Sequence, residues 1–135
     1  MAATLRDEVL TIRTSTDVVQ VRQAVRALAA AQGFSLIDQT KIVTAASELA
    51  RNTLEHGGGG TARLESVTHG LRRGVRLTFE DKGPGIADVG LALTDGYTTG
   101  GGMGLGLSGS KRLVNEFDIS TKPGEGTRVT VTKWK

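Results

Sequence analysis

The sequence predicts one α+β domain in two layers, with helices on one face of a mixed, mostly antiparallel sheet. Strand-like and helix-like segments alternate along the chain, and two consecutive strand-like segments close it around a tight turn. The chain has 135 residues, of which 38% are hydrophobic and 23% charged, which is enough for a single core. We therefore expect one domain that spans residues 1–135.

The first half is expected to supply a strand and two helices. Residues 8–14, EVLTIRT, alternate apolar and polar side chains as a half-buried strand does. Residues 17–33 repeat valine and leucine at helical spacing before a glycine. Residues 35–57 carry a second apolar stripe and also end at a glycine. Ser35 and Asp38 have the spacing of a capping box at its start, with Asp in place of the usual Glu.

The second half is expected to supply two hairpins and a third helix. Residues 62–69 and 74–81 read as strands on either side of GLRR. Residues 104–117 follow a glycine-rich stretch with a helical pattern. Residues 117–122 and 127–134 form the last hairpin around PGEG. The total is about five strands and three helices.

Composition excludes several classes of function. No apolar run approaches the roughly 20 residues of a membrane-spanning helix, and no signal-peptide pattern opens the chain. There is no cysteine, and His56 and His69 are too few and too far apart in sequence for a zinc site. The net charge of +3 is spread along the chain. We therefore expect a cytoplasmic protein with neither nucleic acid nor membrane as a partner.

The segment GGGMGLGL, Gly100 to Leu107, places five glycines in eight positions. The pattern G-x-G-x-x-G also fits residues 104–109, but a loop rather than a strand precedes it, which argues against a Rossmann turn. Glycines that lead into a helix expose backbone N–H groups and the positive end of the helix dipole to an anion. The segment therefore favours a phosphate-binding loop, with a merely flexible glycine loop as the alternative.

The second predicted helix carries polar residues on one face. Glu48 and Asn52 are four residues apart, and Arg51 has Glu55 four residues beyond it as an expected ion-pair partner. Asn is a poor residue for a helix interior, and its amide oxygen is a good ligand for Mg²⁺. A carboxylate one turn away could take a proton from an attacking hydroxyl. An exposed face crossed by ion pairs is the alternative, and His56 fits the helix C-terminus on dipole grounds alone.

An acid stands at the end of the strand that precedes EDKGPGI, residues 80–86. Asp81 leaves the sheet where Gly83, Pro84 and Gly85 turn the chain sharply. The turn alone explains Gly-Pro-Gly, but it does not require a carboxylate at a strand end, where ligand pockets commonly open. The segment GEGT, residues 124–127, reads by itself as an ordinary hairpin turn.

The four segments ELARNTLEH, EDKGPGI, GGGMGLGL and GEGT, in this order, resemble the ATP-binding boxes of the GHKL superfamily, whose nucleotide domain is the Bergerat fold. The resemblance covers nearly the whole chain and implies ATP and Mg²⁺ as cofactors. It implies that Glu48 is the catalytic base, that Asn52 binds Mg²⁺, and that Asp81 accepts a hydrogen bond from the adenine amino group. The further nucleotide contacts that it implies are Gly83 and Gly85 beside the base, Gly102, Gly104 and Gly106 around the phosphates, and Thr127 near the adenine.

The lid segment between Gly85 and Gly102 is only about 16 residues long. A short lid in a domain of this size resembles the bacterial anti-sigma and switch-protein serine/threonine kinases, above all those of the stressosome. This resemblance implies phosphorylation of serine or threonine on STAS-domain partners, and activation of a regulator such as a PP2C-type phosphatase on release. Two alternatives remain: an anti-sigma kinase that sequesters a sigma factor, and a nucleotide-gated binding module without kinase activity. The presence of Glu48 argues against the last, because a binder needs no base.

Overall fold

The structure is a computed structural model that describes residues 3–86, 98–99, 103–104 and 107–135. The elements in chain order are β1 (Ala3–Ile12), α1 (Ser15–Ala31), α2 (Leu36–Glu55), β2 (Gly60–His69), β3 (Arg72–Asp81), β4 (Thr98–Thr99), β5 (Met103–Gly104), α4 (Leu107–Arg112), β6 (Glu116–Lys122) and β7 (Gly126–Trp134).

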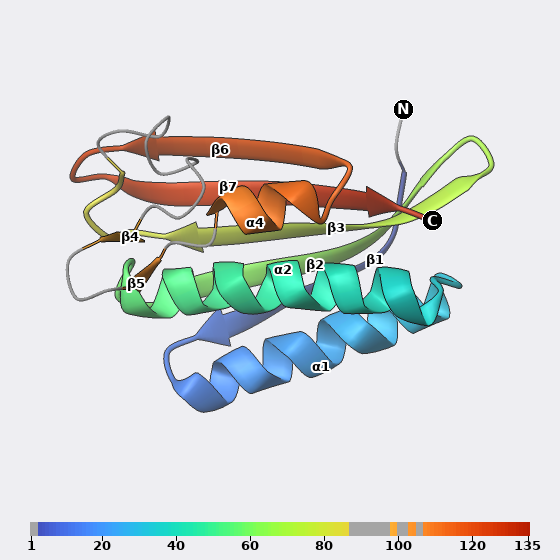
Figure 1. The fold of residues 1–135 in the computed structure, drawn as a ribbon, viewed down its shortest axis with the longest axis horizontal. Helices are drawn as coiled ribbons and strands as arrows, with labels where there is room; N and C mark the ends of the chain where they lie inside the picture. Colours follow the sequence, from blue (N-terminus) through green and yellow to red (C-terminus); the bar gives the residue numbers. More distant parts are fainter. Residues whose placement is uncertain (1–2, 87–97, 100–102, 105–106) are drawn as a thin grey trace.

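Five of these strands form one sheet, in the order β1-β2-β3-β7-β6. All its pairings are antiparallel, so the described sheet is more uniform than the mixed one predicted. The helices α1, α2 and α4 all lie on the same face of the sheet (Figure 1). The predicted two-layer α+β architecture is confirmed, and β4 and β5 form a separate short pair.

Both long helices begin at capped N-termini. At α1, the Thr14 hydroxyl accepts from the N–H of Asp17 at 3.2 Å, and the Asp17 carboxylate accepts from the N–H of Thr14 at 3.1 Å. The N–H donors of Arg13 and Thr14 hold the pKa of Asp17 below its usual value. At α2, the Ser35 hydroxyl accepts from the N–H of Asp38 at 3.2 Å. The reciprocal capping box therefore lies at α1, whereas α2 shows the serine half of the predicted one.

The helix predicted over residues 104–117 is shorter than expected: α4 ends at Arg112, and β6 begins at Glu116. The N–H of Asn115 donates to Thr132 of β7 at 2.9 Å, so the chain has joined the sheet by this point. Phe117 packs against the core from a strand and not from a helix. The apolar spacing that suggested a longer helix thus reflects burial at the sheet edge.

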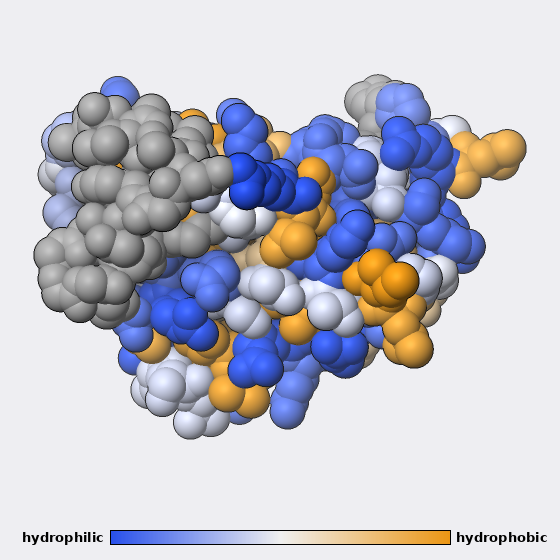
Figure 2. Space-filling view, in the orientation of Figure 1, coloured by the Kyte–Doolittle hydropathy of each residue, from blue (hydrophilic) through white to orange (hydrophobic). Residues whose placement is uncertain are grey.

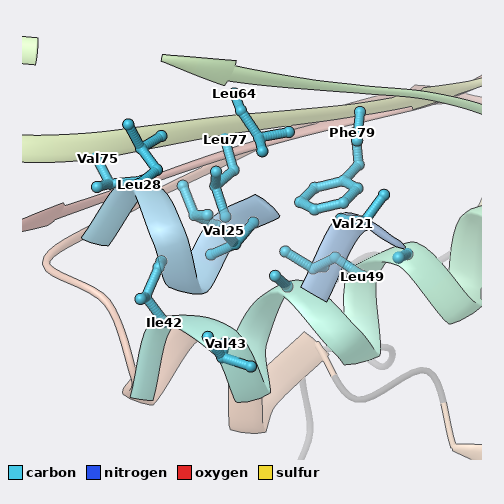
Figure 3. Packing of buried hydrophobic residues seen from close by; sticks show 14 of the residues in the cluster. Val21, Val25, Leu28, Ile42, Val43, Leu49, Leu64, Val75, Leu77 and Phe79 are labelled. Carbon is cyan, nitrogen blue, oxygen red and sulfur yellow. The ribbon is translucent and has the colours of Figure 1, made fainter. Parts of the chain in front are cut away.

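The core fills the space between the helices and the sheet (Figure 3). Phe79 of β3 lies over Val21 of α1 and Leu49 of α2 in this view. On β3 and β7 the cross-strand partners Leu77 and Val131, and then Phe79 and Val129, are buried. Side chains two residues apart on a strand share a face. The next pair on the helix-covered face is therefore Asp81 and Thr127, at the end of the sheet.

The opposite face of the sheet carries a ladder of charges. Glu65 of β2 is only 3% exposed, and both its carboxylate oxygens accept from Arg76 of β3, at 3.1 and 2.9 Å. This hydrogen-bonded pairing raises the pKa of Arg76. Arg63 bonds Asp7 of β1 and lowers its pKa. Paired charges can be buried in this way because the partner satisfies the carboxylate.

The surface over the helices is mostly hydrophilic, with hydrophobic side chains gathered mainly at the end where α2 begins (Figure 2). Leu36 and Ile37, the first residues of α2, are 76% and 70% exposed. Within the described ranges, no helix is long and apolar enough to cross a lipid bilayer.

Ser110 in α4 provides a test of the packing between helices. Ser110 is 1% exposed, and among the described residues its hydroxyl has no hydrogen-bond partner. Because an unsatisfied buried hydroxyl is costly, Ser110→Ala is expected to raise the free energy of unfolding by about 1 kcal/mol. Denaturant titration would measure it. Ser47→Ala in α2 is the control, since the Ser47 hydroxyl donates to Val43 and its removal also loses a hydrogen bond. A loss of stability in Ser110→Ala would contradict the packing described.

Candidate nucleotide site

A small cleft opens between α2, α4 and the ends of β3 and β7. One group of its lining side chains is apolar and comprises Leu49, Phe79, Ile86, Leu107 and Val129. The other group is polar and comprises Asn52, Thr53, His56, Asp81 and Thr127. Apolar walls with a few converging polar groups are the usual lining of a small-molecule site. Three of the predicted site residues, Asn52, Asp81 and Thr127, are thereby brought together.

Asp81 is the last residue of β3 and is held from two sides. Its Oδ1 accepts from the N–H of Gly83 at 2.9 Å. On the other side lies Gly57, just beyond α2, where an added Cβ would stand 2.3 Å from Asp81 Cγ and 2.5 Å from Oδ2. The carboxylate therefore occupies the space that a side chain at position 57 would fill, and Gly83 holds one of its oxygens.

The Gly-Pro-Gly turn is pressed against the protein's own backbone. A Cβ on Gly83 would lie 2.7 Å from Gly57 Cα, and one on Gly85 would lie 2.2 Å from the carbonyl oxygen of Lys122. Gly85 also has a φ of +76°, which favours glycine. His56 Nε2 lies 3.2 Å from the carbonyl oxygen of Gly85 and ties the end of α2 to this turn. That Gly83 and Gly85 lie beside the adenine base of a nucleotide stays a prediction.

Thr127 presents a buried hydroxyl that belongs to a small network. Its Oγ1 lies 2.8 Å from Oγ1 of Thr121 on β6. Thr121 also accepts from the N–H of Ile86 at 2.9 Å and lies 3.0 Å from the carbonyl oxygen of Gly126, to which it can donate. Each hydroxyl has one proton to donate. If Thr121 donates to Gly126, Thr127 must donate to Thr121 and can only accept from a group in the cleft. If Thr121 donates to Thr127 instead, the Thr127 hydroxyl can donate into the cleft.

Glu48 and Asn52 project from α2 one turn apart, as their spacing predicts. Asn52 lines the cleft, whereas Glu48 is not among the lining residues and its side chain is 35% exposed. Glu48 Oε1 accepts from Arg51 Nη1 at 3.0 Å. The expected pair between Arg51 and Glu55 is therefore wrong, because Arg51 turns toward the N-terminal end of the helix.

The predicted phosphate loop falls mainly outside the described residues. Gly102 and Gly106 lie beyond them, while Gly104 stands in β5 opposite Thr98 of β4. Sequence reasoning missed three residues at the site, namely His56, Gly57 and Thr121. The helix stop at Gly57 was visible in the sequence, but its contact with Asp81 joins positions 24 residues apart and has no local signature.

Residues 37–135 match the family described as histidine kinase-, DNA gyrase B-, and HSP90-like ATPase, and the chain belongs to this family. The chain is 43% identical over 123 residues to the serine/threonine-protein kinase RsbT of Bacillus subtilis (strain 168), which covers 91% of this chain and 92% of that protein. It is 29% identical over 118 residues to the anti-sigma F factor of Thermoanaerobacter sp. (strain X514), covering 84% and 82% of the two chains.

The fold has a solved counterpart in the crystal structure of the RsbU and RsbW domains of Rv1364c from Mycobacterium tuberculosis. The TM-score is 0.64 at 24% identity, over 96% of this chain and 33% of that longer one. The predicted GHKL membership and its α+β fold are confirmed, as is the prediction of an enzyme of the serine/threonine-protein kinase class.

The contact between Gly57 and Asp81 is testable. Gly57→Ala places a methyl group where the Asp81 carboxylate lies, so ATP affinity is expected to fall about tenfold or more as that carboxylate moves. Isothermal titration calorimetry measures the affinity, and circular dichroism checks the fold. Gly109→Ala is the matched control, because among the described residues outside its own helix a Cβ there meets no atom within 4 Å. An unchanged ATP affinity in Gly57→Ala would contradict the inference that Gly57 makes room for the Asp81 carboxylate.

Proposed function

We propose that this protein is a switch-protein kinase that uses Mg-ATP to phosphorylate serine or threonine on STAS-domain proteins. Once released from these partners, it activates a downstream regulator such as a PP2C-type phosphatase. The observation that carries the proposal is the arrangement on α2, where Asn52 lines the cleft and an accessible carboxylate, Glu48, stands one turn away. A protein that only binds nucleotide needs the cleft but not the base.

The chemistry of the cleft suits an adenine nucleotide. Its apolar walls can cover a flat heterocycle, and Asp81 and Thr127 stand together at the end of the sheet to bond the edge of the base. Asp81 has one oxygen engaged by Gly83, so the other is the acceptor for the amino group of adenine. We assign the phosphates to Gly102, Gly104 and Gly106, in accord with the sequence pattern.

The amide oxygen of Asn52 suits Mg²⁺, which takes few protein ligands together with phosphates and water. When bound, the ion neutralises charge on the phosphate oxygens. Glu48 then accepts the proton of the serine or threonine hydroxyl as the oxygen of that hydroxyl bonds to the γ-phosphorus. The bond from that phosphorus to the bridging oxygen breaks, and ADP leaves with the electron pair. We place the reaction in the cytoplasm, where ATP is supplied.

A second candidate function is supported by the 29% identity to anti-sigma F factors. An anti-sigma kinase uses the same cleft but also holds a sigma factor. The purified protein should be incubated with labelled ATP and the STAS proteins encoded beside its gene. Phosphorylation of one of them supports the switch-protein kinase. Stable capture of a sigma factor favours the second candidate, and the absence of both favours a nucleotide-gated binding module.

Asp81→Asn is expected to weaken ATP binding at least tenfold and leave the fold intact. Oδ1 can keep its bond to Gly83, but an amide donor then faces the donor group of adenine, which costs on the order of 2–4 kcal/mol. Calorimetry measures the affinity. Asp118→Asn on β6 is the control, since Asp118 is exposed and outside the cleft. Equal affinities for Asp81→Asn and wild type would remove Asp81 from the site.

Glu48→Gln is expected to lower phosphoryl transfer about 10²–10⁴-fold, the usual effect of losing a general base. The change keeps the size of the side chain, so ATP affinity and partner binding should stay near those of wild type. Both are measured in parallel with the rate of transfer to a STAS protein. Glu55→Gln is the matched control, an exposed carboxylate on the same helix. A Glu48→Gln variant as fast as wild type would show that the base lies elsewhere.

A further inference from the structure

We propose that Arg51 is a positioning residue for Glu48: it holds Oε1 of the carboxylate and leaves Oε2 to accept the proton of the phosphoacceptor. The proposal rests on the proposed function, in which Glu48 is the base. Arg51 Nη1 donates to Glu48 Oε1 at 3.0 Å, three residues back along α2. In the described part of the chain, Glu48 makes this single hydrogen bond, so its second oxygen can take a proton.

The direction in which Arg51 points is informative. Glu55 stands four residues beyond Arg51 and is exposed on the same helix, so two carboxylates are within reach of one guanidinium. The guanidinium bonds Glu48, the carboxylate beside the cleft. This choice keeps the carboxylate on the helix face that it shares with Asn52, which lines the cleft one turn farther along α2.

The ion pair is not needed for the stability of the fold. The side chains of Arg51 and Glu48 are 49% and 35% exposed, and exposed ion pairs contribute little to stability. The surface over the helices is mostly hydrophilic (Figure 2). Loss of Arg51 should therefore leave the melting temperature close to that of wild type.

The pair gains importance when a protein substrate covers α2. A phosphoacceptor domain that brings its hydroxyl to Glu48 must displace water from this part of the helix. Desolvation disfavours an ionised carboxylate and strengthens its attraction to a nearby cation. Arg51 then keeps the carboxylate oriented while water is excluded. Its effect should appear in the transfer step and not in ATP binding.

The test is a double-mutant cycle with Arg51→Met and Glu48→Gln. Transfer of phosphate from labelled ATP to the cognate STAS protein gives kcat, and the KM of each substrate is measured in parallel. In the wild-type background, Arg51→Met should lower kcat about tenfold and change the KM for ATP less than about threefold. Arg51→Lys should recover part of the rate, since it restores a cation. In the Glu48→Gln background, Arg51→Met should have no further effect, because residues acting through one another are not additive.

The control is Arg22→Met, which removes an exposed arginine on α1 and should leave kcat unchanged. A wild-type kcat in Arg51→Met, with Glu48→Gln impaired, overturns the role of Arg51 and leaves the proposed function standing. An equal loss in both backgrounds also overturns it, since Arg51 would then act independently of Glu48. A Glu48→Gln variant as fast as wild type overturns the base assignment itself, and with it the role of Arg51.

Discussion

The antiparallel register between β3 and β7 is the constraint on which the site depends. It places Phe79 opposite Val129 in the core and Asp81 opposite Thr127 two residues farther on, so the same alternation that buries the core delivers both polar groups to the cleft. A slip of one residue would move every side chain of one strand to the other face. The core and the proposed nucleotide contacts are therefore fixed by one set of backbone hydrogen bonds.

The site also depends on α2, which packs one face against the core and turns the other toward the cleft and solvent. Leu49 and Ala50 are buried, while Asn52 turns toward the cleft and Glu48 toward solvent. Just beyond the helix stands Gly57, where any side chain would displace the carboxylate of Asp81. The Asp81 side chain thus packs directly on the backbone at Gly57, and this contact joins the helical layer to the sheet beside the cleft.

Much of this could be predicted from local pattern. Alternation marked the strands, helical spacing marked α1 and α2, and the four-residue interval put Glu48 and Asn52 on one face. What could not be predicted depends on contacts distant in sequence. The bond between Thr121 and Thr127 needs the β6–β7 register, and the end of α4 is set by the bond from Asn115 to Thr132. The predicted partner of Arg51 was wrong because two carboxylates, Glu48 and Glu55, lie at helical spacing from it. Spacing alone does not choose between them.

The proposed roles divide the site into two groups that are held in different ways. Asp81 accepts from the N–H of Gly83 and lies against Gly57, and Thr127 is bonded to the Thr121 hydroxyl, so both have partners within the protein. Glu48 and Arg51 are held by one another on an exposed helix face, where water weakens their interaction. If Glu48 is the base, a partner protein that covers it excludes this water and strengthens the pairing with Arg51. On the proposed mechanism, binding of nucleotide and activation of the base are thus separate events, and the second belongs to the partner. This separation suits a kinase whose activity is decided by which protein covers α2.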